Sequence, residues 1–214
     1  MTKSIAYSPI RLPRGYLSWS QYDLLNKNEE AYIRDYIRGE ERKNGWAQER
    51  AMEFGKNIAN VLDGDGTDDD IISLMKATIP KYPKPEEPIE AILRAKGREV
   101  KLIGKIDSYD PEPKFLEYKT GKWKWTQEKA NKHGQLLFYK VMIWINQRKN
   151  AGSKLIWIPT EESDYGELCL TGEEPKVFDV HHTEADILSM MGKIIRTAER
   201  IEYLMDREVN DIFG

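Results

Sequence analysis

The sequence has only one cysteine, Cys169, in 214 residues. A single cysteine excludes an internal disulfide framework and fits a reducing compartment. No apolar run approaches the ~20 residues that a membrane-spanning helix requires. The N-terminal segment, MTKSIAYSPI, has no continuous apolar core of the kind that signal peptides carry. These absences predict a cytoplasmic protein with no membrane segment.

The chain also has no overall excess of positive charge. Its formal net charge is −3, which excludes a globally basic protein that coats DNA. The local charge differs, because the segment from Lys114 to Lys140 contains seven lysines and two glutamates. A basic site on an acidic body steers a polyanion to one place. A solvated, lysine-rich helix face would have the same composition, so charge alone leaves both interpretations open.

What the chain does have is enough length and aromatic content for a packed core. Its 214 residues suffice for one well-cored domain, and six Trp and eleven Tyr exclude a disordered chain. Apolar periodicity predicts helices early, then strands, a long helix, more strands and a final helix. This order predicts an α/β or α+β domain whose central mixed sheet is flanked by helices.

The expected elements follow from caps, turns and periodicity. Ser18 or Ser20 caps the first helix, which continues to about Tyr36. The other helices are expected at 45–62, 68–78, 126–147 and 184–209, and strands at 90–95, 99–107, 114–120 and 154–159, with a closing hairpin of 166–170 and 176–181. We expect one domain over 1–214, with a helical subdomain (16–86), a catalytic sheet and helix core (87–182) and a C-terminal packing helix (183–209).

Three charged residues stand close together in the segment that forms the second and third strands. Asp107 ends the β-rich segment 101–107, and a proline-containing turn at 110–113 follows. The next strand carries Glu117 and Lys119, which point to the same face because side chains alternate along a strand. If the two strands form a hairpin, Asp107 meets Glu117 near its open end.

This arrangement suits a metal that cleaves phosphodiester bonds. Two carboxylates that lie close together repel, and a hard divalent cation such as Mg²⁺ or Mn²⁺ relieves the repulsion. Such a metal lowers the pKa of a bound water, and Lys119 could orient that water or stabilise the transition state. The alternative is a surface hairpin held together by salt bridges.

The motifs around these residues favour the metal site. Gly104 precedes Asp107, and a helix after the strand carries Gln135 and Tyr139 four residues apart. The pattern G-x-x-D, E-Y-K-T-G-K and G-Q-x-x-x-Y resembles the PD-(D/E)xK nuclease superfamily, in its RecB-like and phage exonuclease-like branch. The resemblance is strong over residues 104–139 and looser over most of the chain.

The resemblance implies a restriction-endonuclease-like core and hydrolysis by in-line attack, without a covalent enzyme intermediate. It implies Mg²⁺ or Mn²⁺ held by Asp107, Glu117 and the carbonyl of Tyr118. Some RecB-like relatives carry an iron–sulfur cluster on four cysteines, which one cysteine cannot hold. The residues to which the resemblance assigns catalysis are Asp107, Glu117, Lys119, Gln135 and Tyr139.

One position departs from the family pattern. In the family, a helical glycine is followed four residues later by His or Glu, which adds a metal ligand. Counting from Gly55, that position is Ala59. Glu53 is a weak substitute, and a surface glutamate is the alternative interpretation. The departure leaves open a nuclease fold that binds nucleic acid without cleaving it.

The linker after the catalytic strand alternates cations with indoles. Lys122, Trp123, Lys124 and Trp125, with Lys132 in the following helix, could grip a strand by phosphate contact and base stacking. Alternatively, one tryptophan packs into the core and the lysines are solvated.

We therefore expect a Mg²⁺-dependent DNA nuclease of a prokaryotic or phage-infected cell. The resemblance favours an exonuclease that processes single- or double-stranded DNA ends in recombination, repair or phage replication. An endonuclease of the same fold, or a non-catalytic nucleic-acid-binding module, is the alternative. A homo-oligomer or a recombination partner stays open.

Overall fold

The computed structural model describes residues 6–40, 46–64, 70–163 and 167–213. The elements, in chain order, are β1 (Ser8–Pro9), α1 (Trp19–Lys27), α2 (Glu29–Tyr32), the π-helical turn η1 (Ile33–Ile37), α3 (Trp46–Asp63), α4 (Asp70–Thr78), β2 (Lys84–Ala95), β3 (Arg98–Asp110), β4 (Lys114–Gly121), α5 (Gln127–Asn131), α6 (Gly134–Gln147), β5 (Gly152–Glu162), β6 (Leu168–Leu170), β7 (Lys176–Val180) and α7 (Glu184–Phe213).

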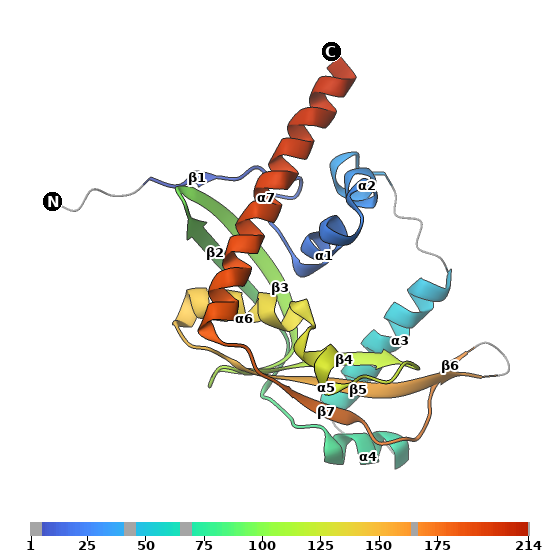
Figure 1. Cartoon of the computed structure of the whole chain (residues 1–214). Helices are drawn as coiled ribbons and strands as arrows, with labels where there is room; N and C mark the ends of the chain where they lie inside the picture. The colour runs from blue at the N-terminus through green and yellow to red at the C-terminus, as the bar shows by residue number, and fades with distance from the viewer. Residues whose placement is uncertain (1–5, 41–45, 65–69, 164–166, 214) are drawn as a thin grey trace.

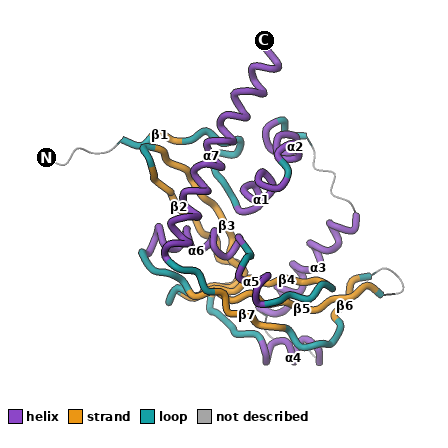
Figure 2. Tube along the Cα trace, viewed as in Figure 1, coloured by secondary structure: helices purple, strands orange, loops and turns teal. Residues whose placement is uncertain are grey.

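The strands form one mixed, seven-stranded sheet in the order β1-β3-β4-β5-β6, with β2 paired to β3 and β7 paired to β5 (Figures 1 and 2). β4 and β5 are parallel, and the connection between them passes through α5 and α6. A parallel pair requires a crossover of this kind. The mixed sheet flanked by helices confirms the fold class predicted from the sequence.

The sheet forks in its middle. β3 and β4 pair over only three positions, from Ser108 with Leu116 to Asp110 with Lys114. Before Ser108, β3 remains paired with β2 on one edge, whereas β4 continues alongside β5 as far as Gly121. Figure 2 shows β2 and β3 rising away from β4 and β5. The backbone pairing of β3 with β4 therefore ends just before Asp107 on β3 and just after Leu116 on β4.

Helices cover both faces of β4 and β5. The larger core lies on the face covered by α1, α6 and α7, and the smaller core lies under α3 and α4. Side chains alternate, so Phe115 belongs to the larger core and Leu116 to the smaller one. Burial on both faces is typical of parallel strands.

The two long helices of the larger core bury continuous apolar stripes. α6 buries five fully covered side chains: Leu136, Phe138, Val141, Met142 and Ile143. α7 buries residues at intervals of three, four and seven, as an amphipathic helix does: Ile187, Ile194, Ala198, Ile201 and Leu204. α6 thus becomes a fixed support, from which polar side chains of its first turns can reach β4.

Two local predictions are confirmed, the cap of α1 and the turn between β2 and β3. Ser18 caps α1, and its hydroxyl accepts a hydrogen bond from the backbone N–H of Gln21. Lys96 and Gly97 form the β2–β3 turn, both with positive φ (52° and 74°), as a two-residue hairpin turn requires. Within the described residues, no helix is both long and apolar enough to cross a bilayer.

The single helix predicted over 126–147 is wrong, because it divides into α5 and α6 at Lys132 and His133. Gly134 begins α6, and the Trp19 ring packs directly on it, since a Cβ at position 134 would lie 2.5 Å from Trp19 Cη2. Glycine also has a low helix propensity. Long-range packing from α1 thus decides where the helix breaks.

The closing hairpin predicted from 166–170 and 176–181 is also wrong. β6 pairs with residues 160–162 of β5, and β7 pairs with residues 153–157 of the same strand. The two short strands lie along different parts of β5 and do not pair with each other. Alternation identifies a strand, but it does not identify the partner.

β2 begins six residues earlier than predicted, at Lys84, and contains Pro85 and Pro88. Its described pairing is with β3 alone, so the missing proline N–H groups can face away from the ladder. The segment that contains Pro85 and Pro88 thus belongs to the sheet.

Lys140 on α6 is a buried cation whose removal is expected to stabilise the protein. Its side chain is 2 % exposed, and Nζ donates to the Val180 carbonyl at 3.1 Å. Burial lowers its pKa to about 8. Ser153 Oγ donates to the same carbonyl at 3.0 Å, so the carbonyl keeps a partner without the lysine. Lys140→Met is therefore expected to raise the melting temperature at pH 7.

The same variant should show a defined pH dependence. The pKa of Lys140 lies at about 8 in the folded state, against an ordinary 10.5, so the unfolded chain binds more protons between these values. Wild-type stability should rise over this window as the buried charge is lost, and the advantage of Lys140→Met should shrink. Thermal denaturation from pH 7 to 10 measures it, with exposed Lys193→Met as control. A lower melting temperature at pH 7, or a pH-independent difference, would contradict this expectation.

Candidate active site

Asp107 lies where the two strands separate. Its Oδ2 accepts a hydrogen bond from the backbone N–H of Tyr118 at 2.7 Å. The side chain thus takes the place that a backbone carbonyl would have if β3 and β4 had stayed paired. The N–H and C=O of one residue point to the same edge of a strand, so the Tyr118 carbonyl also faces the fork.

Glu117 and Lys119 point from β4 toward α6. Glu117 is 2 % exposed, and its Oε1 accepts a hydrogen bond from Lys119 Nζ at 2.6 Å. The ammonium group also donates to Gln135 Oε1 at 2.9 Å. Two acceptors therefore fix its position beside the carboxylate.

A chain of hydrogen bonds continues from Lys119 across the fork. Gln135 Nε2 donates to the Tyr139 hydroxyl at 3.1 Å, and this hydroxyl donates to the Lys105 carbonyl at 2.8 Å. The chain joins β4, α6 and β3, so it holds the two arms of the fork at a fixed separation. The five residues predicted to be catalytic are thus brought together.

Burial dominates the electrostatics of the carboxylates. It raises the pKa of Glu117 to about 7, with a smaller contribution from nearby Asp107, although Lys119 opposes the change. Burial also raises the pKa of Asp107, although the hydrogen bond from the Tyr118 N–H and the charge of Lys119 both act to lower it. Burial thus disfavours the charged form of both acids, and a bound cation would offset this cost.

The residues at the fork fit a hard divalent cation. Glu117 Oε2 is buried and has no hydrogen-bond partner among the described residues. Carboxylates of Asp107 and Glu117 and a backbone carbonyl are the oxygen donors that Mg²⁺ and Mn²⁺ prefer. No group of three His, Cys, Asp or Glu side chains gathers for a metal in the described parts of the chain. The protein would thus supply few ligands, as is common for Mg²⁺.

The helix expected to supply a third ligand packs on the other face of β4. A Cβ on Gly55 of α3 would lie 3.2 Å from Thr120 Oγ1, and Thr120 points away from the face of Lys119. Glu53 is exposed. Ala59 is within α3, but its side chain is not among the described ones. The missing third ligand at this position therefore stays a prediction from the sequence.

The cation and indole linker divides into two parts. Trp123 is 76 % exposed, and Lys122 and Lys124 are also exposed. Trp125 instead packs against the larger core, with Lys129 Nζ 4.3 Å from its ring centre. Lys132 forms an ion pair with Glu128 at 2.6 Å, and both side chains are largely exposed. The tertiary structure therefore leaves Trp123 as the aromatic that a ligand can reach.

The site also contains groups that the sequence does not reveal. The Lys105 carbonyl anchors Tyr139, yet any residue at position 105 would supply that atom. His133 is the N-cap residue of α6, and burial lowers its pKa to about 3. The only signal for His133 is its place before Gly134, at the helix break.

Gly104 has a steric role in the site. A Cβ at this position would lie 2.7 Å from Tyr139 Cε1, which is closer than such contacts allow. Gly104→Ala is expected to displace Tyr139, to loosen Gln135 and Lys119, and to lower stability by about 1–3 kcal/mol. Cleavage activity should fall even where the variant is fully folded. Assays well below its melting temperature would show this loss.

Gly152→Ala is the matched control, because its Cβ would meet Lys114 Cγ at an ordinary 3.5 Å. If Gly104→Ala retained wild-type activity, the hydrogen-bond chain would not be needed to position Lys119.

Comparison with known proteins agrees with this geometry. The family model described as PD-(D/E)XK nuclease superfamily matches residues 21–208. The chain belongs to this superfamily. Its fold is restriction-endonuclease-like, as the resemblance implied, whereas the fork in the sheet was not predicted. The match is to the superfamily, so the RecB-like branch stays a prediction.

A solved structure supports the fold of this PD-(D/E)XK nuclease. A protein of Eubacterium rectale that carries the provisional name exonuclease has a TM-score of 0.57 at 13 % identity, over 89 % of this chain and 82 % of its own. The protein SSO0001 matches at 13 % identity over 91 % and 78 %, with a TM-score of 0.39. No curated protein matches the sequence.

Proposed function

We propose that this PD-(D/E)XK nuclease is a Mg²⁺- or Mn²⁺-dependent hydrolase of DNA phosphodiester bonds. The observation that carries the proposal is the acidic pair at the fork, in which Glu117 is buried and Asp107 half-buried. Glu117 Oε2 is unpaired within the described structure, and Lys119 is fixed beside it. A structural salt bridge would not require a second acid, Asp107, beside the buried Glu117 at the point where the strands separate.

The chain's own residues divide the work. Asp107, Glu117 and the Tyr118 carbonyl would hold the divalent ion, which supplies charge compensation for the phosphate and a more acidic water. Lys119 orients the attacking water or stabilises the charge that develops on the phosphate oxygens. Gln135 and Tyr139 are positioning residues, because they act on the ammonium through hydrogen bonds.

Exonuclease action on DNA ends, in recombination, repair or phage replication, is the form that we favour. The sequence motifs support it through their resemblance to the RecB-like and phage branch. The provisional name of the Eubacterium rectale protein supports it weakly. We also propose a cytoplasmic location and a helical subdomain over residues 16–86. An endonuclease of the same fold is the alternative.

The test is a time course on end-labelled linear DNA and covalently closed circular DNA, with Mg²⁺, Mn²⁺ or excess EDTA. An exonuclease should degrade the linear DNA alone and stop in EDTA. Cleavage of the circle would show an endonuclease. Binding of DNA without cleavage of either form in any metal would overturn the proposal and favour the non-catalytic module.

A further inference from the structure

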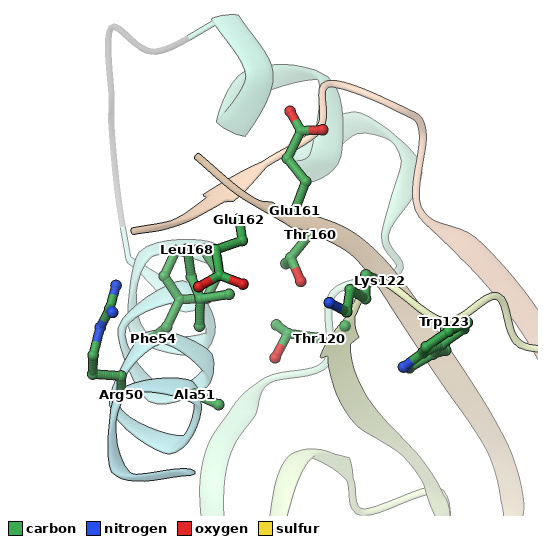
Figure 3. Close-up of a pocket in the computed structure, with 11 residues that line it drawn as sticks. Arg50, Ala51, Phe54, Thr120, Lys122, Trp123, Thr160, Glu161, Glu162 and Leu168 are labelled. Carbon is green, nitrogen blue, oxygen red and sulfur yellow. The ribbon is translucent and has the colours of Figure 1, made fainter. Parts of the chain in front are cut away.

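A pocket of about 290 Å³ lies directly beyond the active site, on the α3 face of the sheet. Three parts of the chain enclose it: α3, the end of β4 with the linker, and β5 with β6 (Figure 3). We call it the base pocket; the residues that matter here are Phe54, Thr120, Lys122, Trp123, Glu162 and Leu168.

The base pocket is within reach of a strand bound at the active site. Thr120 follows Lys119 directly, and Gly121, which also lines the pocket, is two residues away. Two residues of a β-strand span ~7 Å. β4 pairs with β3 only up to Leu116, so no β3 backbone covers its edge between the fork and the pocket. A nucleic-acid strand can therefore follow this edge from one site to the other.

The charges of the pocket argue against a phosphate as its occupant. Among the described residues that line it, two cations, Arg50 and Lys122, are balanced by two carboxylates, Glu161 and Glu162. A phosphate site would instead show an excess of donors and cations. Figure 3 shows the Glu162 carboxylate close to Phe54 and Leu168, with the Lys122 ammonium reaching toward the same space. The pocket suits an uncharged group that has both a flat apolar surface and polar edges.

A nucleobase has these properties. The Phe54 and Leu168 side chains offer apolar surface, and the exposed indole of Trp123 can stack on a base at the rim. Glu162 can accept a hydrogen bond from an exocyclic amine, as acidic side chains do from cytosine. The volume is at the small end for ligand pockets, which suits one base and excludes a base pair.

We propose that the base pocket holds one unpaired nucleobase of the strand being cut, close to the scissile phosphate. This inference rests on the proposed nuclease function and deepens it, because it names the substrate class. A base paired within a duplex cannot enter unless it leaves the stack. The enzyme therefore acts on single strands or on frayed ends, and cleaves a fully paired end more slowly.

The test uses wild-type protein and an end-labelled single strand with one abasic nucleotide, resolved on a denaturing gel in Mg²⁺. Loss of one stacked base should slow cleavage about 5- to 100-fold at a phosphate within two nucleotides of the abasic position. The slow step should move when the abasic nucleotide moves. Trp123→Ala should lower cleavage at every phosphate and remove the slow step, whereas Trp123→Phe should keep it.

Tyr203→Ala is the matched control, because Tyr203 is an exposed aromatic on α7 (55 % exposed) and does not line the pocket. Trp123 is itself largely exposed, so its removal should leave the fold intact. The proposal of a base pocket would be overturned if wild-type protein cleaved every phosphate near the abasic nucleotide at the normal rate. It would also be overturned if the slow step persisted in Trp123→Ala. No cleavage of the unmodified single strand by a protein that degrades linear duplex DNA would also overturn the base pocket. No cleavage of either substrate would instead count against the proposed function.

Discussion

Asp107→Asn is expected to lower DNA cleavage by about 10³-fold or more while leaving the fold intact. Asparagine keeps an oxygen that can accept the 2.7 Å hydrogen bond from Tyr118 N–H, so the fork retains this contact. It removes the charge that would hold the divalent ion, and a bound ion would contribute several kcal/mol to stabilising the transition state. Initial rates on linear DNA, together with circular dichroism, measure the two effects separately.

Asp110→Asn is the matched control. Asp110 is on the same hairpin, and its carboxylate also accepts a backbone hydrogen bond, from Glu112 N–H at 2.9 Å. It is part of the paired section of β3 and not of the fork. Near-wild-type cleavage is expected. If the two variants lost activity equally, or if Asp107→Asn cleaved normally, the assignment of the metal site to Asp107 would fail.

Glu117→Gln is expected to abolish cleavage and to stabilise the metal-free protein at neutral and higher pH. Burial raises the pKa of Glu117 to about 7, so above this pH the protein carries a buried carboxylate whose charge Lys119 compensates only in part. Glutamine removes that cost. The expected gain is on the order of 2 kcal/mol at pH 8, with EDTA present.

The pH dependence gives a sharper test than the stability at one pH. The folded-state pKa lies above the ordinary value of 4.5, so the folded protein binds more protons between pH 4.5 and 7. The contribution of Glu117 is thus fully present below pH 4.5 and is lost as pH rises through 7. Metal-free wild type should lose this stability over the window, whereas Glu117→Gln should not, and urea denaturation at several pH values measures the difference.

Glu112→Gln is the control, because Glu112 is an exposed acid on the same hairpin with a side chain 83 % accessible. It should change neither stability nor cleavage beyond a few tenths of a kcal/mol. Saturating Mg²⁺ should stabilise wild type but not Glu117→Gln, since binding to the folded state alone shifts the equilibrium. A destabilised Glu117→Gln at pH 8 would show that the ion pair with Lys119 outweighs the burial of its charge.

The residues of the candidate site are close in sequence, and this is why the motif could predict that they lie together. Glu117 and Lys119 share a face through strand alternation alone, and Gln135 and Tyr139 share one through helix periodicity. The tertiary structure adds the hydrogen bonds that connect these residues. Lys119 donates to Gln135, and the Tyr139 hydroxyl donates to the Lys105 carbonyl. Main-chain acceptors of this kind leave no signal in the sequence.

Long-range packing accounts for the errors. The break between α5 and α6 depends on Trp19, more than one hundred residues earlier, packing on Gly134. The two short strands β6 and β7 both pair with β5, because strand pairing depends on which edge of the sheet is open. Local periodicity contains neither fact.

The sequence by itself determined which side chains share the candidate site, because alternation and helical spacing place neighbouring residues on common faces. Only the tertiary structure decided that the sheet forks between Asp107 and Tyr118, that α3 covers the face opposite Lys119, and that a pocket lies beyond Thr120. The physical reason is that these features depend on which strand edges stay unpaired and which helices bury their apolar faces against them. Both depend on contacts between segments that are far apart in the chain.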